Sequence, residues 1–352
     1  MNNLCLAAIF LLLFSFKLPL FSISAIHALS NHTDRLALLH FKQSITSDPF
    51  GILSSWNDYV SFCNWPGITC GRRHPRVTRL ILDGLNLKGS LSSHIGNLTF
   101  LRFIILANNS FSSEIPQQVG HLFRLQYLLL NNNTIGGEIP ISLMNCSKLR
   151  IISLHENKLS GDIPKEIGTL IKLESFQVSK NNLTGGIPAS LGNLSSLWQF
   201  SVAANHLSGN ISDEIRGLSS LKYFFVGENR LSGTVPSSLY NLSSLNEISI
   251  TANQFNGNLP ANIGFGLPNL QLLQFSDNEF SGTIPDSLSN VSGLQFLELS
   301  FNYFVGPVPT NFGNLLELRM LSLGVNNLGH NSSHDWGFLT SLATVANLKC
   351  YF

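Results

Sequence analysis

Charge is scarce in this sequence of 352 residues. Only 12% of the residues are charged, and 21 Lys and Arg nearly balance 20 Asp and Glu, which leaves a formal net charge of +1. A chain so close to neutral has no electrostatic reason to bind nucleic acid or an anionic membrane surface. The five cysteines are too few for a disulfide-dense scaffold or for several zinc sites. The apolar share of 44% argues against disorder.

The sequence also lacks the motifs that catalysis requires. It contains no G-x-x-x-x-G-K phosphate loop, no H-E-x-x-H, no C-x-x-C, no G-x-S-x-G and no kinase signature. The G-x-G at 264–266 does not continue as a dinucleotide fingerprint, and the His-acid pairs at 155–156 and 334–335 lack a third partner at metal-ligand spacing. We therefore predict a binding protein and not an enzyme, with no cofactor and no metal site.

A single long apolar run stands at the start of the chain, and no later run reaches 18 residues. The run Leu4–Leu20 is followed by small residues, which favours a signal peptide over residues 1–25, cleaved between Ser24 and Ala28. The alternative is an uncleaved anchor helix, for which the run is short. We expect entry into the secretory pathway, an extracellular or apoplastic mature chain, and no membrane span once the signal is removed.

Sequons for N-glycosylation support export. The pattern Asn-x-Ser/Thr occurs eleven times, at Asn31, Asn97, Asn108, Asn132, Asn145, Asn182, Asn193, Asn210, Asn241, Asn290 and Asn331. A single match means little, but this number in a chain with an export signal predicts glycosylation of several of them.

One repeat organises residues 77–330. A leucine recurs every 24 residues, with one extra residue near Phe265, at Leu101, Leu125, Leu149, Leu173, Leu197, Leu221, Leu245, Leu270, Leu294 and Leu318. Eight positions after each leucine stands an asparagine, at Asn109, Asn133, Asn157, Asn181, Asn205, Asn229, Asn253, Asn278, Asn302 and Asn326. With a degenerate first copy from Val77, which has Leu85 in place of the asparagine, the chain contains eleven copies.

Each repeat position has a physical reason. Residues 149–154 predict a short strand in which Leu149, Ile152 and Leu154 point inward while Ile151 and Ser153 point outward. Such a strand cannot bury its apolar face alone, so successive copies are expected to stack into a parallel sheet around one continuous core. The repeated asparagine would satisfy backbone groups where the chain leaves the strand, forming a buried ladder.

The second half of each copy returns the chain to the next strand. In the third complete copy, Gly161 permits a turn, and Pro164 holds the return path extended. A helical or 3₁₀ turn is expected at 165–170. Strand, turn, extended stretch and helical turn together predict an α/β solenoid.

The pattern L-x-x-L-x-L-x-x-N-x-L-x-G-x-I-P resembles the plant-type extracellular leucine-rich repeat. Residues 31–70 resemble the N-terminal cap of that family, through the segments at 34–39, 53–57 and 63–70. The resemblance implies a right-handed superhelix with a concave parallel sheet, a helical cap over 26–76, repeats over 77–330 and an incomplete repeat without a C-terminal cap over 331–352. Within the family, the chain looks most like ectodomains of receptor-like kinases that recognise microbial patterns.

The resemblance also implies partners and context. A peptide or protein ligand would bind the concave face, a co-receptor ectodomain is a further expected partner, and the role would be cell-surface perception in defence signalling. A full-length receptor would continue with more repeats, a membrane helix that places it in the plasma membrane, and a kinase. The chain is then either a truncated receptor or a short secreted form with a frayed end. The alternative function is a soluble inhibitor resembling the plant wall proteins that bind polygalacturonases.

The cysteines are assigned structural roles. Cys63 and Cys70, in an exported chain, favour a disulfide over two free thiols, worth roughly 2–3 kcal/mol in the chain-entropy model. Trp56 and Trp65 would seal the open end of the first repeat. Cys146 stands where other copies have leucine, which favours a small buried hydrophobe over a reactive thiol, and Cys350 has no obvious partner.

The outward strand positions form columns across the predicted concave face. Exposed aromatic side chains there would anchor a ligand, although they could instead only cover neighbouring strands. Glycans on Asn97 and its equivalents would lie on the convex side, whereas glycans on Asn108 and Asn132 would screen Phe103 and Tyr127. We therefore place the ligand site on the middle and later copies, at Tyr223, Phe225, Glu228, Glu247, Gln274, Asp277, Phe296 and Glu298.

The end of the sequence departs from the repeat. The eleventh copy lacks the Gly-x-Ile-Pro segment, and no paired cysteines follow it. Solenoids normally need a capping unit at both ends. We therefore expect residues 342–352 to expose an apolar edge that promotes aggregation.

Overall fold

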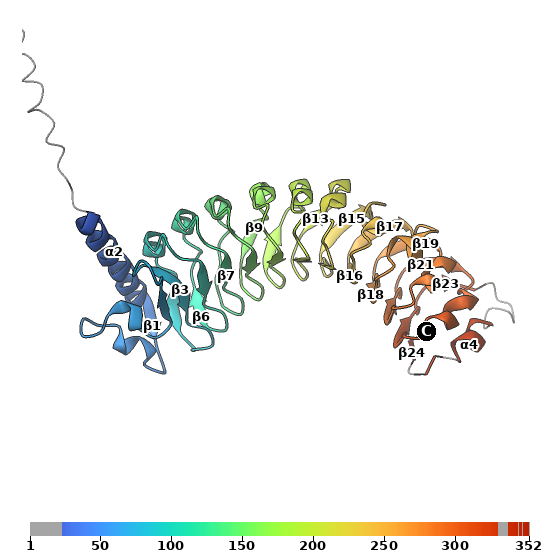
Figure 1. Cartoon of the computed structure of the whole chain (residues 1–352). Helices are drawn as coiled ribbons and strands as arrows, with labels where there is room; N and C mark the ends of the chain where they lie inside the picture. The colour runs from blue at the N-terminus through green and yellow to red at the C-terminus, as the bar shows by residue number, and fades with distance from the viewer. Residues whose placement is uncertain (1–22, 330–336, 344, 347, 352) are drawn as a thin grey trace, which may run out of the picture.

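The computed structural model describes residues 23–329, 337–343, 345–346 and 348–351. Over these residues the chain forms an arched solenoid, with short strands on the inner side of the arch and helical turns on the outer side (Figure 1). The predicted α/β solenoid with a concave parallel sheet is confirmed. The apolar run at 4–20 and the sequon at Asn331 lie outside the described residues.

The inner side is a sheet of 13 strands, and all but the first pair run parallel. The strands are β2 Ile68–Cys70, β3 Val77–Ile81, β5 Phe103–Ile105, β7 Tyr127–Leu129, β8 Ile151–Ser153, β10 Ser175–Gln177, β12 Gln199–Ser201, β14 Tyr223–Phe225, β16 Glu247–Ser249, β18 Leu272–Gln274, β20 Phe296–Glu298, β22 Met320–Ser322 and β24 Lys349–Tyr351. The 24-residue period aligns equivalent residues, for example Ser175 with Gln199 and Gln199 with Tyr223.

The asparagines form the predicted ladder. In one coil, the Asn205 amide nitrogen donates to the carbonyls of Val178, Val202 and Ala203 at 3.1, 3.0 and 3.3 Å. Its amide oxygen accepts from the backbone N–H of Leu183 at 3.0 Å. Every complete copy repeats this arrangement, so the side chain joins the backbones of successive coils where sheet hydrogen bonds end.

The residue before each ladder asparagine is left-handed, with φ of 53–56°. This row consists of Asn108, Asn132, Glu156, Lys180, Ala204, Glu228, Ala252, Asp277, Phe301 and Val325. A positive φ is costly for residues other than glycine, and the hydrogen bonds on either side hold it in place.

The extended stretch after each turn forms further sheets, which the sequence did not predict. They contain β1 Ile45–Ser47, β4 Lys88–Ser90 and β6 Ser110–Ser112; β9 Ser160–Asp162 and β11 Asn182–Thr184; and β13 Ser208–Gly209, β15 Arg230–Thr234, β17 Gln254–Asn258, β19 Glu279–Thr283, β21 Tyr303–Gly306 and β23 Asn327–Leu328. The expected turn glycine is left-handed in these coils, as at Gly161 with φ 73°.

Helical turns cover the outer side. They are the 3₁₀ helices η3 Ser93–Asn97, η4 Gln117–His121, η5 Ile141–Asn145, η6 Lys165–Thr169, η7 Ala189–Asn193, η8 Asp213–Gly217, η9 Leu239–Asn241, η10 Asp286–Asn290 and η11 Thr310–Asn314, with one α-turn, α3 Ile263–Gly266. The expected turn at 165–170 is thus η6. The additional residue near Phe265 falls in α3, where an α-turn takes the place of a 3₁₀ turn.

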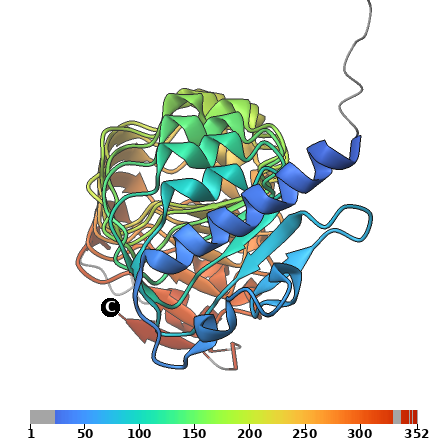
Figure 2. The same cartoon turned by 90° about the vertical axis from the view of Figure 1, so that its left-hand side faces the viewer.

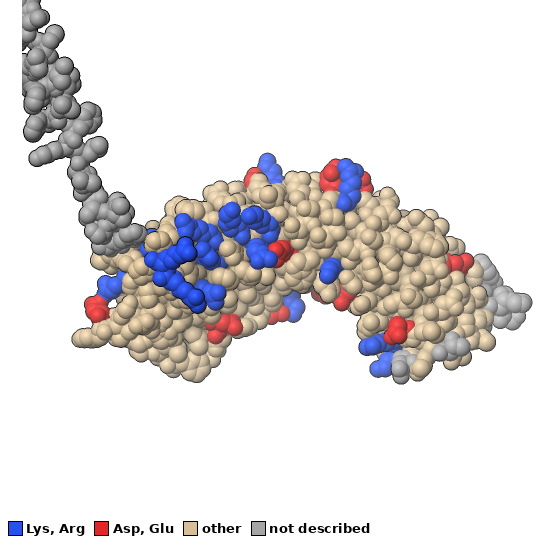
Figure 3. All heavy atoms as spheres, viewed as in Figure 1, with Lys and Arg blue, Asp and Glu red and all other residues tan. Residues whose placement is uncertain are grey.

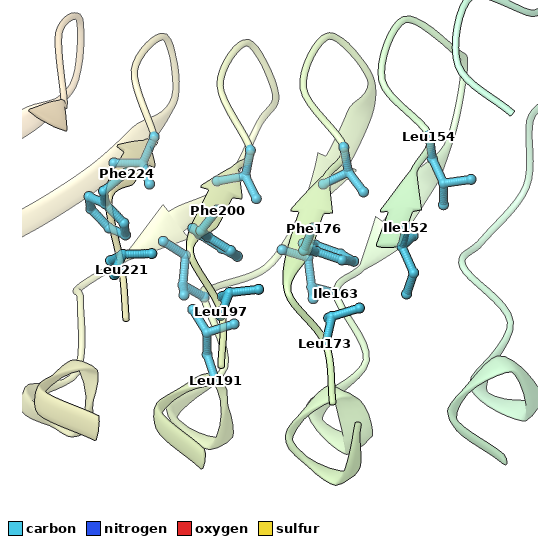
Figure 4. Packing of buried hydrophobic residues seen from close by; sticks show 14 of the residues in the cluster. Ile152, Leu154, Ile163, Leu173, Phe176, Leu191, Leu197, Phe200, Leu221 and Phe224 are labelled. Carbon is cyan, nitrogen blue, oxygen red and sulfur yellow. The ribbon is translucent and has the colours of Figure 1, made fainter. Parts of the chain in front are cut away.

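One apolar core runs through the solenoid. Leucines and isoleucines from every coil are buried in it. In the middle coils, Phe176, Phe200 and Phe224 stack face to face, with ring centroids 6.0 and 5.8 Å apart (Figure 4). Each coil therefore buries its apolar face against the next, as stacked repeats require.

The N-terminal end is closed by α2 Ile23–Gln43, which lies across the first coil (Figure 2). The short 3₁₀ helices η1 Ile52–Ser55 and η2 Phe62–Asn64 follow it. Trp56 and Trp65 are buried and stacked, with ring centroids 5.2 Å apart, and a disulfide joins Cys63 to Cys70. The buried carboxylate of Asp34 forms two hydrogen bonds, of 3.0 and 2.8 Å, with the guanidinium of Arg76, which the sequence did not predict.

At the other end, the expectation of an apolar edge over 342–352 is wrong for its first part. Leu342 and Val345 are buried, because α4 Gly337–Leu342 packs against η11 and covers the core there. The exposed part is β24, the last strand of the large sheet, where Tyr351 is 53% exposed.

Candidate ligand-binding surface

The structure brings the eight predicted site residues onto four neighbouring strands and the turns that follow them. Tyr223 and Phe225 lie on β14, Glu247 on β16, Gln274 on β18, and Phe296 and Glu298 on β20. Glu228 and Asp277 follow β14 and β18, in the left-handed row. The strands pair in register, so the side chains form one surface on the inner side of the arch.

Aromatic side chains occupy one end of this surface. Tyr223 and Phe225 are both half-buried, and their ring centroids lie 6.2 Å apart. Trp198, just before β12, packs edge-on against Tyr223 with centroids 5.9 Å apart. Trp198 was not among the predicted site residues, although its position directly after a repeat leucine could have indicated it. The three rings hold one another in place and still present apolar surface to solvent.

The other end carries the carboxylates of Glu247 and Glu298 and the amide of Gln274, together with the ring of Phe296. The Gln274 amide nitrogen donates to a Glu298 carboxylate oxygen at 2.9 Å, which orients both side chains. Glu247 lies in register between Tyr223 and Leu272. An aromatic anchor beside several acceptor oxygens suits a ligand that carries both apolar groups and hydrogen-bond donors.

The coils N-terminal to this surface carry a polar network instead. Gln177 donates to Ser175 and to Gln199 at 2.9 and 3.1 Å, and Ser179 lies 2.6 Å from Ser201. Ser153 was predicted to point outward, and Ser175 has the outward phase of Ile151 one repeat later, but the two serines are only 5% and 1% exposed. Their side chains are small, and larger neighbours on adjacent strands cover them.

The left-handed row also contains an ion pair. The Lys180 ammonium lies 2.6 Å from a Glu156 carboxylate oxygen, and this contact lowers the pKa of Glu156 and raises that of Lys180. Burial lowers the pKa of the neighbouring His155. In the part of the chain that the structure describes, no three His, Cys, Asp or Glu side chains gather as metal ligands.

Cys146 is fully buried, as a small core residue would be. Burial raises the pKa of its thiol to about 12, and its sulfur donates to the Val119 carbonyl at 3.4 Å. A thiol in this environment is poorly reactive, because the reactive form is the thiolate.

Seven of the glycosylation sequons fall into two groups, five on the outer side of the arch and two after its inner strands. Asn97, Asn145, Asn193, Asn241 and Asn290 are exposed and each ends a 3₁₀ helix on the outer side of the arch. Asn108 and Asn132 follow inner strands, and the Asn132 amide nitrogen donates to the Asn108 amide oxygen at 2.6 Å. Glycosylation itself stays a prediction, and this arrangement keeps the five outer sites away from the candidate surface.

Family models match most of the described chain. A leucine rich repeat N-terminal domain matches residues 31–71, a leucine-rich repeat region matches 74–212, and single leucine rich repeats match 269–291 and 293–315. Among curated proteins, the LRR receptor-like serine/threonine-protein kinase EFR of Arabidopsis thaliana is 53% identical over 89 residues, which cover 25% of this chain and 9% of EFR.

Two solved structures extend the similarity to the fold. The LRR ectodomain of the receptor kinase GASSHO1/SCHENGEN3 from Arabidopsis thaliana, in complex with CASPARIAN STRIP INTEGRITY FACTOR 2, matches 90% of this chain and 38% of its own with 31% identity and a TM-score of 0.83. The plant peptide hormone receptor RGFR1 in complex with RGF2 matches 68% of this chain and 42% of its own, with 32% identity and a TM-score of 0.62.

The chain thus spans only a small part of EFR and less than half of the protein chain in either solved structure. Among the described residues, no helix has both the length and the apolar character needed to cross a bilayer.

Proposed function

The chain belongs to the plant-type leucine-rich-repeat proteins and resembles the ectodomains of receptor-like kinases, and from this premise we propose that its concave face binds a peptide or protein ligand. The observation that carries the proposal is the surface over β14, β16, β18 and β20, where half-buried aromatic rings adjoin carboxylates on a rigid sheet. Preorganised aromatic side chains give binding energy at low entropic cost.

The cellular role is part of the same proposal. Ligand binding on this face would serve perception at the cell surface, in an extracellular setting, with a co-receptor ectodomain as second partner. The relatives support this, since EFR and GASSHO1/SCHENGEN3 are receptor kinases and RGFR1 is a plant peptide hormone receptor. Entry into the secretory pathway through residues 1–25 and a defence role belong to the proposal as well. No feature of the described residues specifically favours the polygalacturonase-inhibitor alternative.

The test is the double variant Tyr223→Ala/Phe225→Ala. Random peptides displayed on phage are selected on the wild-type chain, and the enriched peptides are then titrated against both proteins. We expect the double variant to bind these peptides at least about tenfold more weakly, because it lacks two aromatic side chains that anchor the ligand.

The matched control is Tyr59→Ala/Phe265→Ala, which removes two exposed rings, 95% and 71% accessible, that lie off the large sheet. This variant should bind like the wild type. Enriched peptides that bind the Tyr223→Ala/Phe225→Ala protein with wild-type affinity would show that the site is elsewhere.

A further inference from the structure

Cationic side chains gather on one flank of the first coils. Figure 3 shows Lys and Arg concentrated near the N-terminal end of the visible face, with few Asp or Glu among them. We call this surface the cationic flank and define it by eight exposed residues: Arg72, Arg73, Arg79, Arg102, Arg124, Lys148, Arg150 and Lys172. With a net charge of only +1 for the whole chain, this is a strong local segregation of charge.

Stacking of the coils aligns these side chains. Arg124, Lys148 and Lys172 each stand directly before a repeat leucine, in three consecutive coils. Equivalent positions on neighbouring parallel strands lie about 4.8 Å apart. The three cations therefore form a row along the flank, beside the loop that carries Arg72 and Arg73.

The cations have little internal neutralisation. Arg150 is paired with Glu174, at 2.6 Å. Within the described ranges, no ion pair is formed by Arg102, Lys148 or Lys172. Unpaired like charges repel one another, so binding of an anion to this row is favourable.

Aromatic rings lie between the cations. The guanidiniums of Arg76 and Arg124 lie 4.4 and 4.0 Å from the ring centroid of Phe100. Arg79 lies 4.5 Å from the ring centroid of Phe103, which stacks on Tyr127 with centroids 4.7 Å apart. These contacts hold the guanidiniums of Arg79 and Arg124 in position, and neither of the two forms an ion pair within the described ranges, whereas Arg76 is paired with Asp34.

Arg79, Arg124, Phe100 and Phe103 also line an open hollow of about 580 Å³. Its wall contains Arg72, Arg79, Arg102, Phe100 and Phe103. Next to the row of cations, two large apolar side chains are exposed in equivalent positions, Phe123 at 53% and Ile171 at 62%. The flank therefore offers positive charge and apolar surface at the same place.

We infer that the cationic flank is a docking surface for an acidic peptide segment of a partner protein, in which aromatic or aliphatic residues stand between the carboxylates. The segment's carboxylates would pair with the row Arg124, Lys148 and Lys172, and its apolar residues would contact Phe123, Ile171 and the hollow. A polyuronate chain or a lipid headgroup would pair with the cations, but it has no apolar group to contact Phe123 and Ile171. This surface goes beyond the proposed concave site and does not share its eight residues.

The test uses a short fluorescein-labelled peptide of alternating Glu and Phe, and a Glu/Ser peptide of equal charge. The wild-type chain should bind the Glu/Phe peptide more tightly, with an affinity that falls as salt rises. The triple variant Arg124→Glu/Lys148→Glu/Lys172→Glu should lose at least about tenfold in affinity. All three side chains are exposed, and the thermal unfolding midpoint checks that the variant folds.

The control changes charge by the same amount elsewhere. Lys158, Lys165 and Arg230 are exposed and lie away from the flank, so Lys158→Glu/Lys165→Glu/Arg230→Glu should retain binding. An equal loss in this control would overturn the proposal, because net charge alone would then explain the effect. Equal binding of the two peptides, tighter binding of polygalacturonate or of phosphatidylserine vesicles, or no binding of the Glu/Phe peptide would overturn it as well.

A last variant separates the two surfaces. Tyr223→Ala/Phe225→Ala should bind the Glu/Phe peptide like the wild type even if it loses the phage-selected peptides. Loss of the Glu/Phe peptide in this variant would mean that there is a single site on the concave face and none on the flank.

Discussion

At the scale of single residues, the ladder asparagines connect the coils. The Asn205 side chain is only 6% exposed and hydrogen-bonds the backbone at four positions on two successive coils. The amide carries two N–H donors and a carbonyl acceptor on separate atoms, whereas a hydroxyl has a single donor, a carboxylate has none and Leu has neither group. Asp, Ser or Leu at this position would therefore leave backbone groups unpaired. The repeated asparagine is therefore explained by hydrogen bonding and not by packing.

We predict that Asn205→Ala lowers the free energy of unfolding by about 2–4 kcal/mol, because it leaves buried backbone groups without partners. Urea denaturation followed by circular dichroism measures the change. Asn256→Ala serves as control: this asparagine is exposed on β17 and its removal should cost less than about 0.5 kcal/mol. Similar losses in the two variants would contradict the role assigned to the ladder.

At the scale of elements, the outer helical turns pack at the limit of close approach. Gly192 lies in η7 with an ordinary negative φ, and a Cβ built on it would stand 2.1 Å from the Glu214 carbonyl oxygen of the next turn. The backbones of adjacent turns can therefore approach only because the side chain is a hydrogen atom. Met144 and Tyr240 stand at the equivalent position in other coils. The residue at this position therefore sets the distance between a helical turn and the next one.

We expect Gly192→Ala to destabilise the protein by about 1–3 kcal/mol, since η7 and η8 must move apart to admit the methyl group. Differential scanning calorimetry provides the comparison. In Gly293→Ala the added Cβ would have its nearest neighbour, the Leu270 carbonyl oxygen, at 3.8 Å, which is ordinary contact. That control should unfold within a few degrees of the wild type, and an equally stable Gly192→Ala protein would show that the turns are not closely packed.

At the scale of the whole molecule, the two ends of the large sheet differ. The first end is covered by α2 and by a cap with buried tryptophans. At the other end, β24 pairs with β22 on one side, and among the described strands none pairs with its other side. Although Leu342 and Val345 are buried, the backbone of β24 remains an open edge that can pair with another chain.

The 352-residue polypeptide should therefore associate as its concentration rises. A lysine at the edge opposes such pairing, so Tyr351→Lys is expected to shift the association to at least about threefold higher concentration. Sedimentation velocity with a reductant, which keeps the exposed Cys350 thiol from forming disulfides, measures this. The variant Tyr303→Lys changes an equally exposed tyrosine on β21 and should associate like the wild type. A wild-type chain that is monomeric at all concentrations would refute the prediction.

The amino-acid sequence by itself determined everything that follows from the 24-residue period. The period assigns each residue a phase, and the phase alone decides whether it lies on the inner strand, in the ladder or on the outer turn. For this reason the ladder, the turn glycines and the columns that hold Tyr223 and Glu298 could be predicted from spacing. Whether those columns bind a ligand stays a proposal.

Only the tertiary structure decided features that depend on contacts between coils. The additional sheets arise because extended stretches of adjacent coils come close enough to pair, which no single copy encodes. Ser175 is buried although its phase points outward, since the size of its neighbours on other strands sets its exposure. The cationic flank likewise depends on the fold, because the loop at 71–76 and the stacking of the coils bring together cations that are spread from Arg72 to Lys172 in the sequence. The net charge of +1 does not reveal this cluster, because acidic residues elsewhere in the chain balance it.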